Sequence, residues 1–385
     1  MQGVTAAAGF RAAGVTAGIK ASGKPDLALV LNEGPLRHAA AVFTSNRVAA
    51  APVHWSREVV KDGRVDAVIL NSGGANACTG APGFQDTHRT AEEVAKLLGV
   101  SATDVVVCST GLIGERLPME KILAGATAAS AQLSADGGAA AARSIMTTDT
   151  VPKQAERAGT GYVIGGMAKG AGMLAPALAT MLVVITTDAV LSPEQLDAAL
   201  RAATGVSFDR ADSDGCMSTN DTVVLMASGA SGVTPDPAEF EALLADLCTD
   251  LALQLLADAE GASHDIAVQT INAASLEDAL EVSRAVSRSN LFKTAIFGND
   301  PNWGRVLSEV GTTKAAFEAS DLDVTINGVM VCRGCGVGED RSLVDLASAR
   351  EVSVVIDLKA GEERATVWTN DLTHDYVEEN SAYSS

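Results

Sequence analysis

The sequence predicts an α+β fold in which helices are layered outside a mixed or antiparallel sheet. Short apolar runs typical of strands recur along the chain. Longer stretches with the spacing of amphipathic helices lie between several of these runs. The two kinds of segment do not alternate strictly, and strict alternation is what a doubly wound parallel sheet would require.

The predicted strands are runs of mainly apolar residues; they cover residues 27–31, 67–70, 105–108, 181–186, 222–226, 266–270 and 352–356. Helices are predicted over residues 87–98, 192–203, 237–259 and 275–287. The second of these helices has clear start signals, because Pro193 suits the first helical position and Ser192 with Gln195 fits a capping box.

Three further segments differ from these patterns. The alanine-rich residues 124–142 are predicted to form a surface helix pair joined at Gly137 and Gly138. The glycine-rich residues 161–172 are interpreted as a boundary before an apolar run. Residues 207–221, which we call the acidic loop, form a second boundary between a helix and a strand.

Composition restricts the function of the chain. It has 385 residues, of which 47% are hydrophobic and only 4% aromatic, so a large core must be built mainly from small aliphatic side chains. The formal net charge is -20. An evenly acidic surface repels phosphate backbones, so no nucleic acid partner is expected. A small anionic substrate would need its own local cation.

Cellular location is predicted from cysteine use and from the apolar segments. The six cysteines are spread through a long chain, as is typical of free thiols in a reducing cytosol. The first residues show no secretion signal, and the apolar residues 175–185 are too short to span a bilayer. We therefore expect a soluble, cytoplasmic protein with no membrane partner.

Two motifs are weighed as metal or redox sites. In the acidic loop, Asp209, Asp212, Asp214, Asn220 and Asp221 could ligate Ca²⁺ or Mg²⁺, but their spacing is not that of an EF-hand. A structural turn is the favoured interpretation of this loop. The lone C-x-x-C motif at residues 332–335 has no second pair to complete a zinc site, and we predict a turn between strands there. No metal or nucleotide cofactor is expected.

The most informative residue is Thr180, which stands at the mouth of an apolar strand after a glycine-rich approach. One interpretation is a strand-start threonine whose hydroxyl bonds to the backbone. The other is a nucleophile, which needs a base within reach. An α-amine with a pKa near ~8 suits that task at neutral pH. An internal threonine gains such an amine only if the bond before it is cut.

Motifs along most of the chain resemble those of the ornithine acetyltransferase family of arginine biosynthesis. They lie at residues 71–80, 108–115, 145–150, 165–182, 293–305 and 371–380. The resemblance implies an αββα layered sandwich, like that of the self-processing aminopeptidases. It also implies autocatalytic cleavage between Ala179 and Thr180. The α chain would then be residues 1–179, with the oxyanion loop, and the β chain residues 180–385, with a smaller C-terminal α/β lobe.

The resemblance also implies roles for individual residues. Thr180 is implied to be the N-terminal nucleophile, and Thr110 and Gly111 the oxyanion pair. Positions that resemble the family's substrate contacts are Thr147, Lys169, Thr180, Glu260, Asn380 and Ser385. By charge, Lys169 suits a substrate carboxylate and Glu260 suits the ornithine ammonium.

The implied reaction is acetyl transfer from N-acetylornithine to glutamate through an acetyl-threonine, by a protein of two α and two β chains. Ornithine is the first product, and acetyl-CoA is a second acetyl donor in bifunctional members. Two alternatives stay open at this point: a self-processing amidohydrolase or aminopeptidase of the same fold, and a binding protein in which Thr180 is structural.

Overall fold

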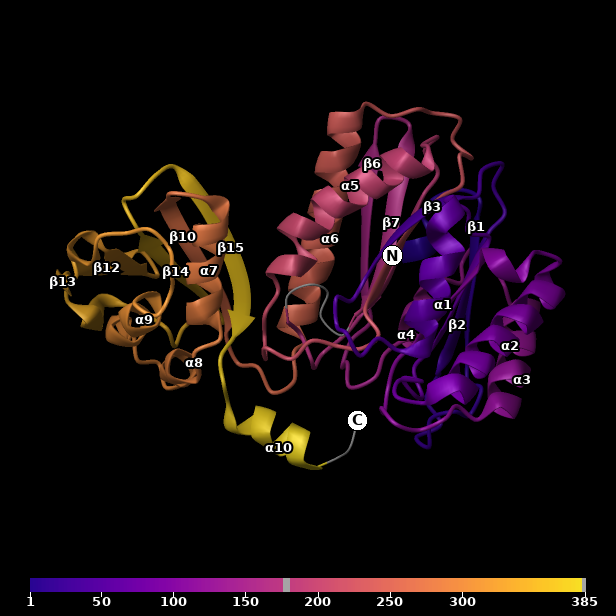
Figure 1. Ribbon diagram of the computed structural model, residues 1–385, viewed down its shortest axis with the longest axis horizontal. Coiled ribbons are helices and arrows are strands. Elements are labelled where there is room, and N and C mark those ends of the chain that lie inside the picture. Colours follow the sequence, from indigo (N-terminus) through magenta and orange to yellow (C-terminus); the bar gives the residue numbers. More distant parts are fainter. Residues whose placement is uncertain (176–180, 383–385) are drawn as a thin grey trace.

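The computed structural model describes residues 1–175 and 181–382, in which three β-sheets organise the chain (Figure 1). Two of the sheets stack into a layered body, and the third forms a smaller lobe that contains most of the C-terminal part of the chain. Short 3₁₀ helices lie at Gly3–Thr5, Val60–Asp62, Ala102–Asp104, Phe208–Arg210, Ala319–Asp321 and Arg341–Leu343.

The first sheet of the body has four strands in the order β1-β2-β4-β5. Their bounds are β1 (Phe10–Val15), β2 (Leu27–Asn32), β4 (Ala67–Asn71) and β5 (Val105–Ser109). Helices α2 (Gly80–Leu98) and α3 (Met119–Ala131) pack on its outer face, and α1 (Ala51–Val59) contacts β5 and α2. The pair β4–β5 is parallel and the others are antiparallel, so the sheet is mixed.

The second sheet has the order β3-β9-β8-β7-β6. Its strands are β3 (His38–Phe43), β6 (Lys153–Gly159), β7 (Tyr162–Lys169), β8 (Leu182–Thr187) and β9 (Thr222–Ala227). Its outer face is covered by α5 (Pro193–Val206) and α6 (Pro237–Ala257). Only β8 and β9 pair in parallel within this sheet.

A shared core joins the two sheets. Val30 and Leu70 of the first sheet and Val184 and Val224 of the second belong to the same buried cluster. The layers therefore run helix, sheet, sheet, helix, and the predicted αββα sandwich is confirmed. Because strands such as β2 and β8 are buried on both faces, they are continuously apolar in the sequence rather than alternating.

The third sheet has the order β13-β12-β11-β14-β10-β15. Its strands are β10 (Asp265–Ala273), β11 (Asp323–Ile326), β12 (Val329–Arg333), β13 (Gly336–Val337), β14 (Glu351–Asp357) and β15 (Glu363–Asn370). Helices α7 (Leu276–Ser287), α8 (Asn290–Phe297) and α9 (Trp303–Val310) share its core. Helix α10 (His374–Ala382) leaves this lobe and runs back toward the body (Figure 1).

The seven predicted strands are all present, and so are the four predicted helices. The capping box is confirmed, since Gln195 N donates to Ser192 Oγ at 3.3 Å and Ser192 N donates to Gln195 Oε1 at 2.9 Å. The turn predicted for Cys332 and Cys335 is also confirmed, because it joins β12 to β13.

Two predictions about local structure were wrong in part. The glycine-rich residues are not a boundary passage, because most of them form strand β7, which lies inside the second sheet between β8 and β6. A Cβ on Gly165 would lie 2.0 Å from the Gly3 carbonyl oxygen, so close packing explains that glycine. The alanine-rich pair exists as α3 and α4 (Gly138–Ser144), but α4 is not a surface helix, since Ala141 and Ala142 are buried in the core between the sheets.

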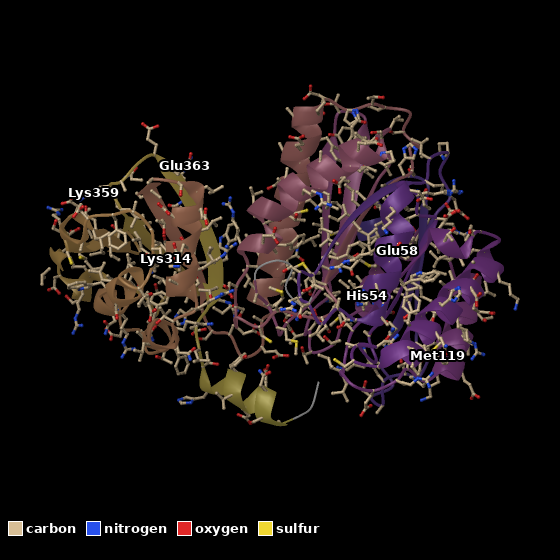
Figure 2. The ribbon with its side chains drawn as sticks, viewed as in Figure 1. His54, Glu58, Met119, Lys314, Lys359 and Glu363 are labelled. Carbon is tan, nitrogen blue, oxygen red and sulfur yellow. The ribbon has the colours of Figure 1, made fainter. Side chains whose placement is uncertain are left out.

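The exterior carries many charged side chains. Glu58 on the body and Lys314, Lys359 and Glu363 on the lobe are all exposed (Figure 2). In the described part of the chain, no helix combines the length and the apolar character needed to cross a membrane.

Candidate active site

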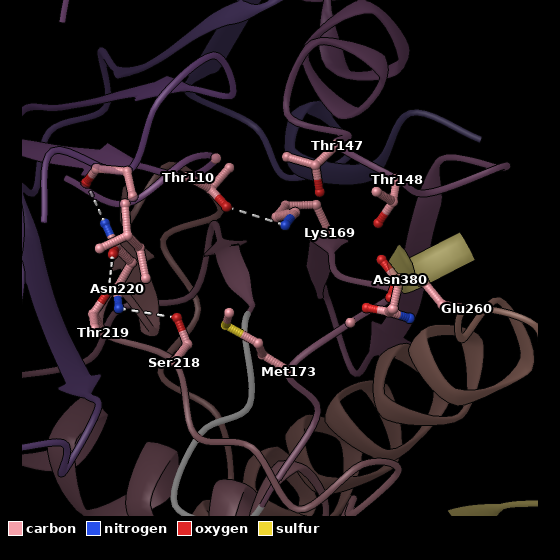
Figure 3. A pocket seen from close by; sticks show the side chains of 14 residues that line it. Thr110, Thr147, Thr148, Lys169, Met173, Ser218, Thr219, Asn220, Glu260 and Asn380 are labelled. Atoms are coloured by element: carbon pink, nitrogen blue, oxygen red, sulfur yellow. Dashed lines mark hydrogen bonds between the residues drawn. The ribbon is translucent and has the colours of Figure 1, made fainter. Parts of the chain in front are cut away.

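A pocket with an empty volume of about 610 Å³ lies where loops from both sheets of the body meet helix α10 (Figure 3). Its lining residues come from distant parts of the sequence: Ala75, Thr110, Gly111, Ile113, Thr147, Thr148, Lys169, Gly172, Met173, Ser218, Thr219, Asn220, Glu260 and Asn380.

The pocket brings together the described members of the predicted site. These are Thr110, Gly111, Thr147, Lys169, Glu260 and Asn380. The other predicted site residues, Ala179, Thr180 and Ser385, lie outside the described residues.

Thr110 and Gly111 follow strand β5 in a tightly held turn. Thr110 N donates to Asn71 O at 3.0 Å, and Thr110 O accepts from Gly74 N at 3.0 Å. Gly111 has a φ of +128°, and a Cβ there would lie 2.8 Å from Gly74 N. The backbone can approach Gly74 this closely only because residue 111 lacks a side chain.

Lys169 places a buried ammonium beside this turn. It ends strand β7, is 1% exposed, and donates from Nζ to Thr110 Oγ1 at 3.2 Å (Figure 3). Burial lowers the pKa of Lys169, while the charges of Asp149, Asp221 and Glu260 act in the opposite direction. An ammonium has three donors, and among the described residues Thr110 is the one hydrogen-bond acceptor that Lys169 Nζ reaches.

Asp149 contributes the largest compensating charge to Lys169. Its carboxylate accepts from Thr147 N at 2.8 Å, from Gly170 N at 2.7 Å and from Lys153 Nζ at 2.5 Å. Burial alone would raise the pKa of Asp149, but the charges of Lys169 and Lys153 and these hydrogen bonds outweigh it and lower the pKa to about 2. Asp149 therefore stays ionised and fixes the loop that carries Thr147.

We predict that Asp149→Asn strongly destabilises the chain, by about 3–5 kcal/mol, because it leaves buried lysines without their shared carboxylate. The pKa in the folded chain, about 2, lies below the usual 3.8, so the stabilisation is complete at neutral pH. It is lost as the pH falls from about 4 through about 2. The difference between the thermal midpoints of the two proteins should be constant above about pH 5 and should narrow as the pH falls from about 4 towards about 2. A difference that does not depend on pH would contradict this.

Glu260 supplies the opposite charge in the pocket. Its backbone N donates to Ala171 O at 3.0 Å, and a Cβ on Gly172 would lie 2.7 Å from Glu260 Oε2. Gly172 therefore makes room for this carboxylate. Asn380 of α10 also lines the pocket and donates from Nδ2 to Tyr376 O of its own helix at 3.0 Å.

Sequence reasoning missed the contribution of the acidic loop to this pocket. Asn220, considered there only as a cation ligand, donates from Nδ2 to Ala75 O at 2.7 Å (Figure 3). It also donates from Nδ2 to Ser109 O at 2.8 Å. It thus ties the acidic loop to the turn before Thr110. The density of polar residues between a helix and a strand was the signal that could have indicated this.

Carboxylates of the acidic loop accept hydrogen bonds from other segments of the protein. Asp212 accepts from Arg288 Nε at 2.7 Å, and Asp221 accepts from Met181 N at 3.0 Å. Among residues 1–175 and 181–382, no cluster of three or more His, Cys, Asp or Glu side chains is arranged to hold a metal ion.

The pocket contains a buried ammonium, a carboxylate and several hydroxyl groups within an αββα fold. Enzymes that act on small charged molecules have concave sites of this kind. Residues 11–385 match the model of the ArgJ family. The arginine biosynthesis bifunctional protein ArgJ of Thermobifida fusca (strain YX) is 66% identical over 382 residues, which are 99% of this chain and 100% of that protein.

Two solved structures are also similar to this chain. The arginine biosynthesis bifunctional protein ArgJ of Bacillus halodurans is 35% identical with a TM-score of 0.50, covering 51% of this chain and 97% of that one. The ornithine acetyltransferase of Mycobacterium tuberculosis, solved in complex with ornithine, is 57% identical with a TM-score of 0.43, covering 47% of this chain and 96% of that one. The chain belongs to the ArgJ family, as its motifs predicted. It is an acetyltransferase of arginine biosynthesis, in a family whose members are named bifunctional.

Proposed function

We propose that this enzyme transfers an acetyl group from N-acetylornithine to glutamate through an acetyl ester on Thr180. The observation that carries the proposal is the convergence of Thr110, Gly111, Lys169 and Glu260 on one pocket. That pocket is also lined by Met173, and the neighbouring Asp221 binds the backbone of Met181. The described residues before and after Thr180 therefore lie at the pocket or beside it.

The nucleophile is generated by self-cleavage in this proposal. The Thr180 hydroxyl adds to the Ala179 carbonyl carbon, the C–N bond breaks, and an ester forms. Water then hydrolyses the ester, leaving a carboxylate on Ala179 and a free α-amine on Thr180, which serves as the base. Support comes from the solved Bacillus halodurans chain, 97% of which aligns with only 51% of this chain, so it is about half as long. The α chain would be residues 1–179 and the β chain residues 180–385.

Acetyl transfer then follows a ping-pong course. Thr180 takes the acetyl group from N-acetylornithine, ornithine leaves, and the amine of glutamate attacks the ester. Each addition creates an oxyanion, for which the Thr110 hydroxyl and the Gly111 N–H are the proposed donors, each typically worth ~3 kcal/mol. The Lys169 ammonium bonded to the Thr110 hydroxyl makes that hydroxyl a better donor.

The remaining pocket residues are proposed to select the substrate. Lys169 donates to a substrate carboxylate in this proposal, and Glu260 attracts the side-chain ammonium of ornithine. Thr147, Asn380 and Ser385 supply further polar contacts.

We expect Glu260→Gln to raise the KM for N-acetylornithine by about 10-fold or more, since a charge-assisted hydrogen bond is worth about 1.5–3 kcal/mol. Glutamate has no side-chain ammonium, so its KM should change little. Steady-state kinetics with each substrate varied in turn measure both values. An unchanged KM for N-acetylornithine would show that Glu260 does not bind the side-chain ammonium of ornithine.

The reaction is tested by following labelled acetyl from N-acetylornithine. Label in N-acetylglutamate supports the proposal, whereas release of free acetate at the same rate without glutamate would favour a self-processing amidohydrolase.

We further propose that the enzyme needs no metal or nucleotide cofactor, accepts acetyl-CoA as a second donor, and works in the cytoplasm as two α and two β chains.

A further inference from the structure

We propose that the acidic loop holds both flanks of the cleavage segment and that Asp221 is the positioning residue for Thr180. The inference rests on the proposed self-cleavage and adds to it a residue that orients the nucleophile. The acidic loop was identified in the sequence without a function, and its carboxylates do not gather into a cation site in the described part of the chain.

The downstream flank is held at Met181. Met181 N donates to Asp221 Oδ1 at 3.0 Å, and Met181 O accepts from Thr222 N at 3.1 Å. The Met181 nitrogen is bonded to the carbonyl carbon of Thr180 in the same planar peptide unit. The carboxyl of Asp221 therefore holds the N–H of the peptide bond that joins Thr180 to Met181.

The upstream flank is held by the same loop. Leu174 O accepts from Ser213 N at 2.6 Å and from Asp214 N at 3.3 Å, and Leu174 is fully buried. Lys293 of α8 in turn donates to Ser213 O, which connects the loop to the C-terminal lobe. One loop thus fixes the chain immediately before and immediately after residues 175–180, and both contacts would persist once a bond between them is cut.

The burial of Asp221 in this position is energetically unfavourable. Asp221 is 0% exposed. Burial raises its pKa well above the usual value, and interactions with Met181, Thr44, Lys169 and Ser218 only partly offset this. The carboxyl accepts from Met181 N through Oδ1, so an asparagine, which keeps the Oδ1 acceptor, is its close substitute.

The chain offers a matched control at the other end of β8. Asp188 is also buried, at 6% exposure, and its carboxylate accepts from Val163 N at 2.8 Å and from Ala8 N at 3.1 Å. Asp188→Ala therefore removes a buried carboxylate that holds backbone amides beside the same strand, without touching Met181.

The test is a time course of cleavage of newly synthesised full-length chain on a denaturing gel, with thermal midpoints of each variant. Asp221→Ala should slow cleavage at least about 10-fold, as expected for loss of one orienting hydrogen bond. Asp221→Asn should cleave within about 3-fold of wild type, and Asp188→Ala should lower the thermal midpoint but cleave like wild type. In the cleaved fraction of Asp221→Ala, kcat should fall with KM unchanged.

Cleavage of folded Asp221→Ala at the wild-type rate would overturn the inference while leaving the proposed function intact. If Asp221→Ala does not fold, Asp221→Asn decides: normal cleavage supports the acceptor role, and a folded but uncut chain overturns it. An uncut wild-type chain would instead contradict the proposed function itself.

Discussion

Thr180→Ala is expected to yield a single uncut chain that transfers no acetyl group. Alanine lacks the hydroxyl that attacks the Ala179 carbonyl, and without cleavage no α-amine is released to act as base. Removing a covalent nucleophile typically costs about 10⁴-fold or more in kcat. Intact mass and transfer of labelled acetyl to glutamate measure the two effects on the same preparation.

Thr180→Ser is the matched control for this substitution. It keeps a hydroxyl and should still be cut, with slower cleavage and measurable transfer. If the alanine chain stayed intact yet transferred acetyl at the wild-type rate, Thr180 would not be the nucleophile.

Thr110→Val is expected to lower kcat for acetyl transfer by about 10²–10³-fold and to slow self-cleavage. Valine matches threonine in shape, and the backbone contacts of Thr110 with Asn71 and Gly74 do not involve the side chain. The substitution therefore removes the hydroxyl that Lys169 Nζ contacts at 3.2 Å and leaves the turn in place.

Thr110→Ser separates a chemical role from a packing role, since it restores the hydroxyl but not the methyl group. Serine should recover most of the lost rate in both cleavage and transfer assays. Equal activity of the valine and wild-type enzymes would exclude the Thr110 hydroxyl from the oxyanion site.

Much of the layered body could be predicted from the sequence because its strands are buried on both faces. Strands β2, β4, β5, β8 and β9 each contain a continuous apolar run, a pattern that can be recognised without knowledge of the neighbouring strands. Strand β7 was not predicted, because its glycines are explained only by tertiary contacts, such as that between Gly165 and Gly3.

The pocket could be predicted in part. Resemblance to family motifs selected Thr110, Lys169 and Glu260, but no local pattern shows that they share one cavity. The ion pair of Lys153 with Asp258 joins segments distant in the sequence, and the charge of Asp149 acts on Lys169 across separate segments, so neither was predictable.

The contacts of the acidic loop could not be predicted for the same reason. Its composition indicated a turn or a cation site, and both interpretations considered the loop alone. Its contacts with Leu174, Met181 and Ala75 are made to other segments, and only the folded chain reveals them.

N-terminal sequencing of the purified, active wild-type enzyme tests the account most directly. We predict two sequences in equal amount, one from the original N-terminus and one that begins Thr-Met-Leu at Thr180. A preparation with full acetyl-transfer activity that contains only the original N-terminus would contradict cleavage, and with it the proposed base.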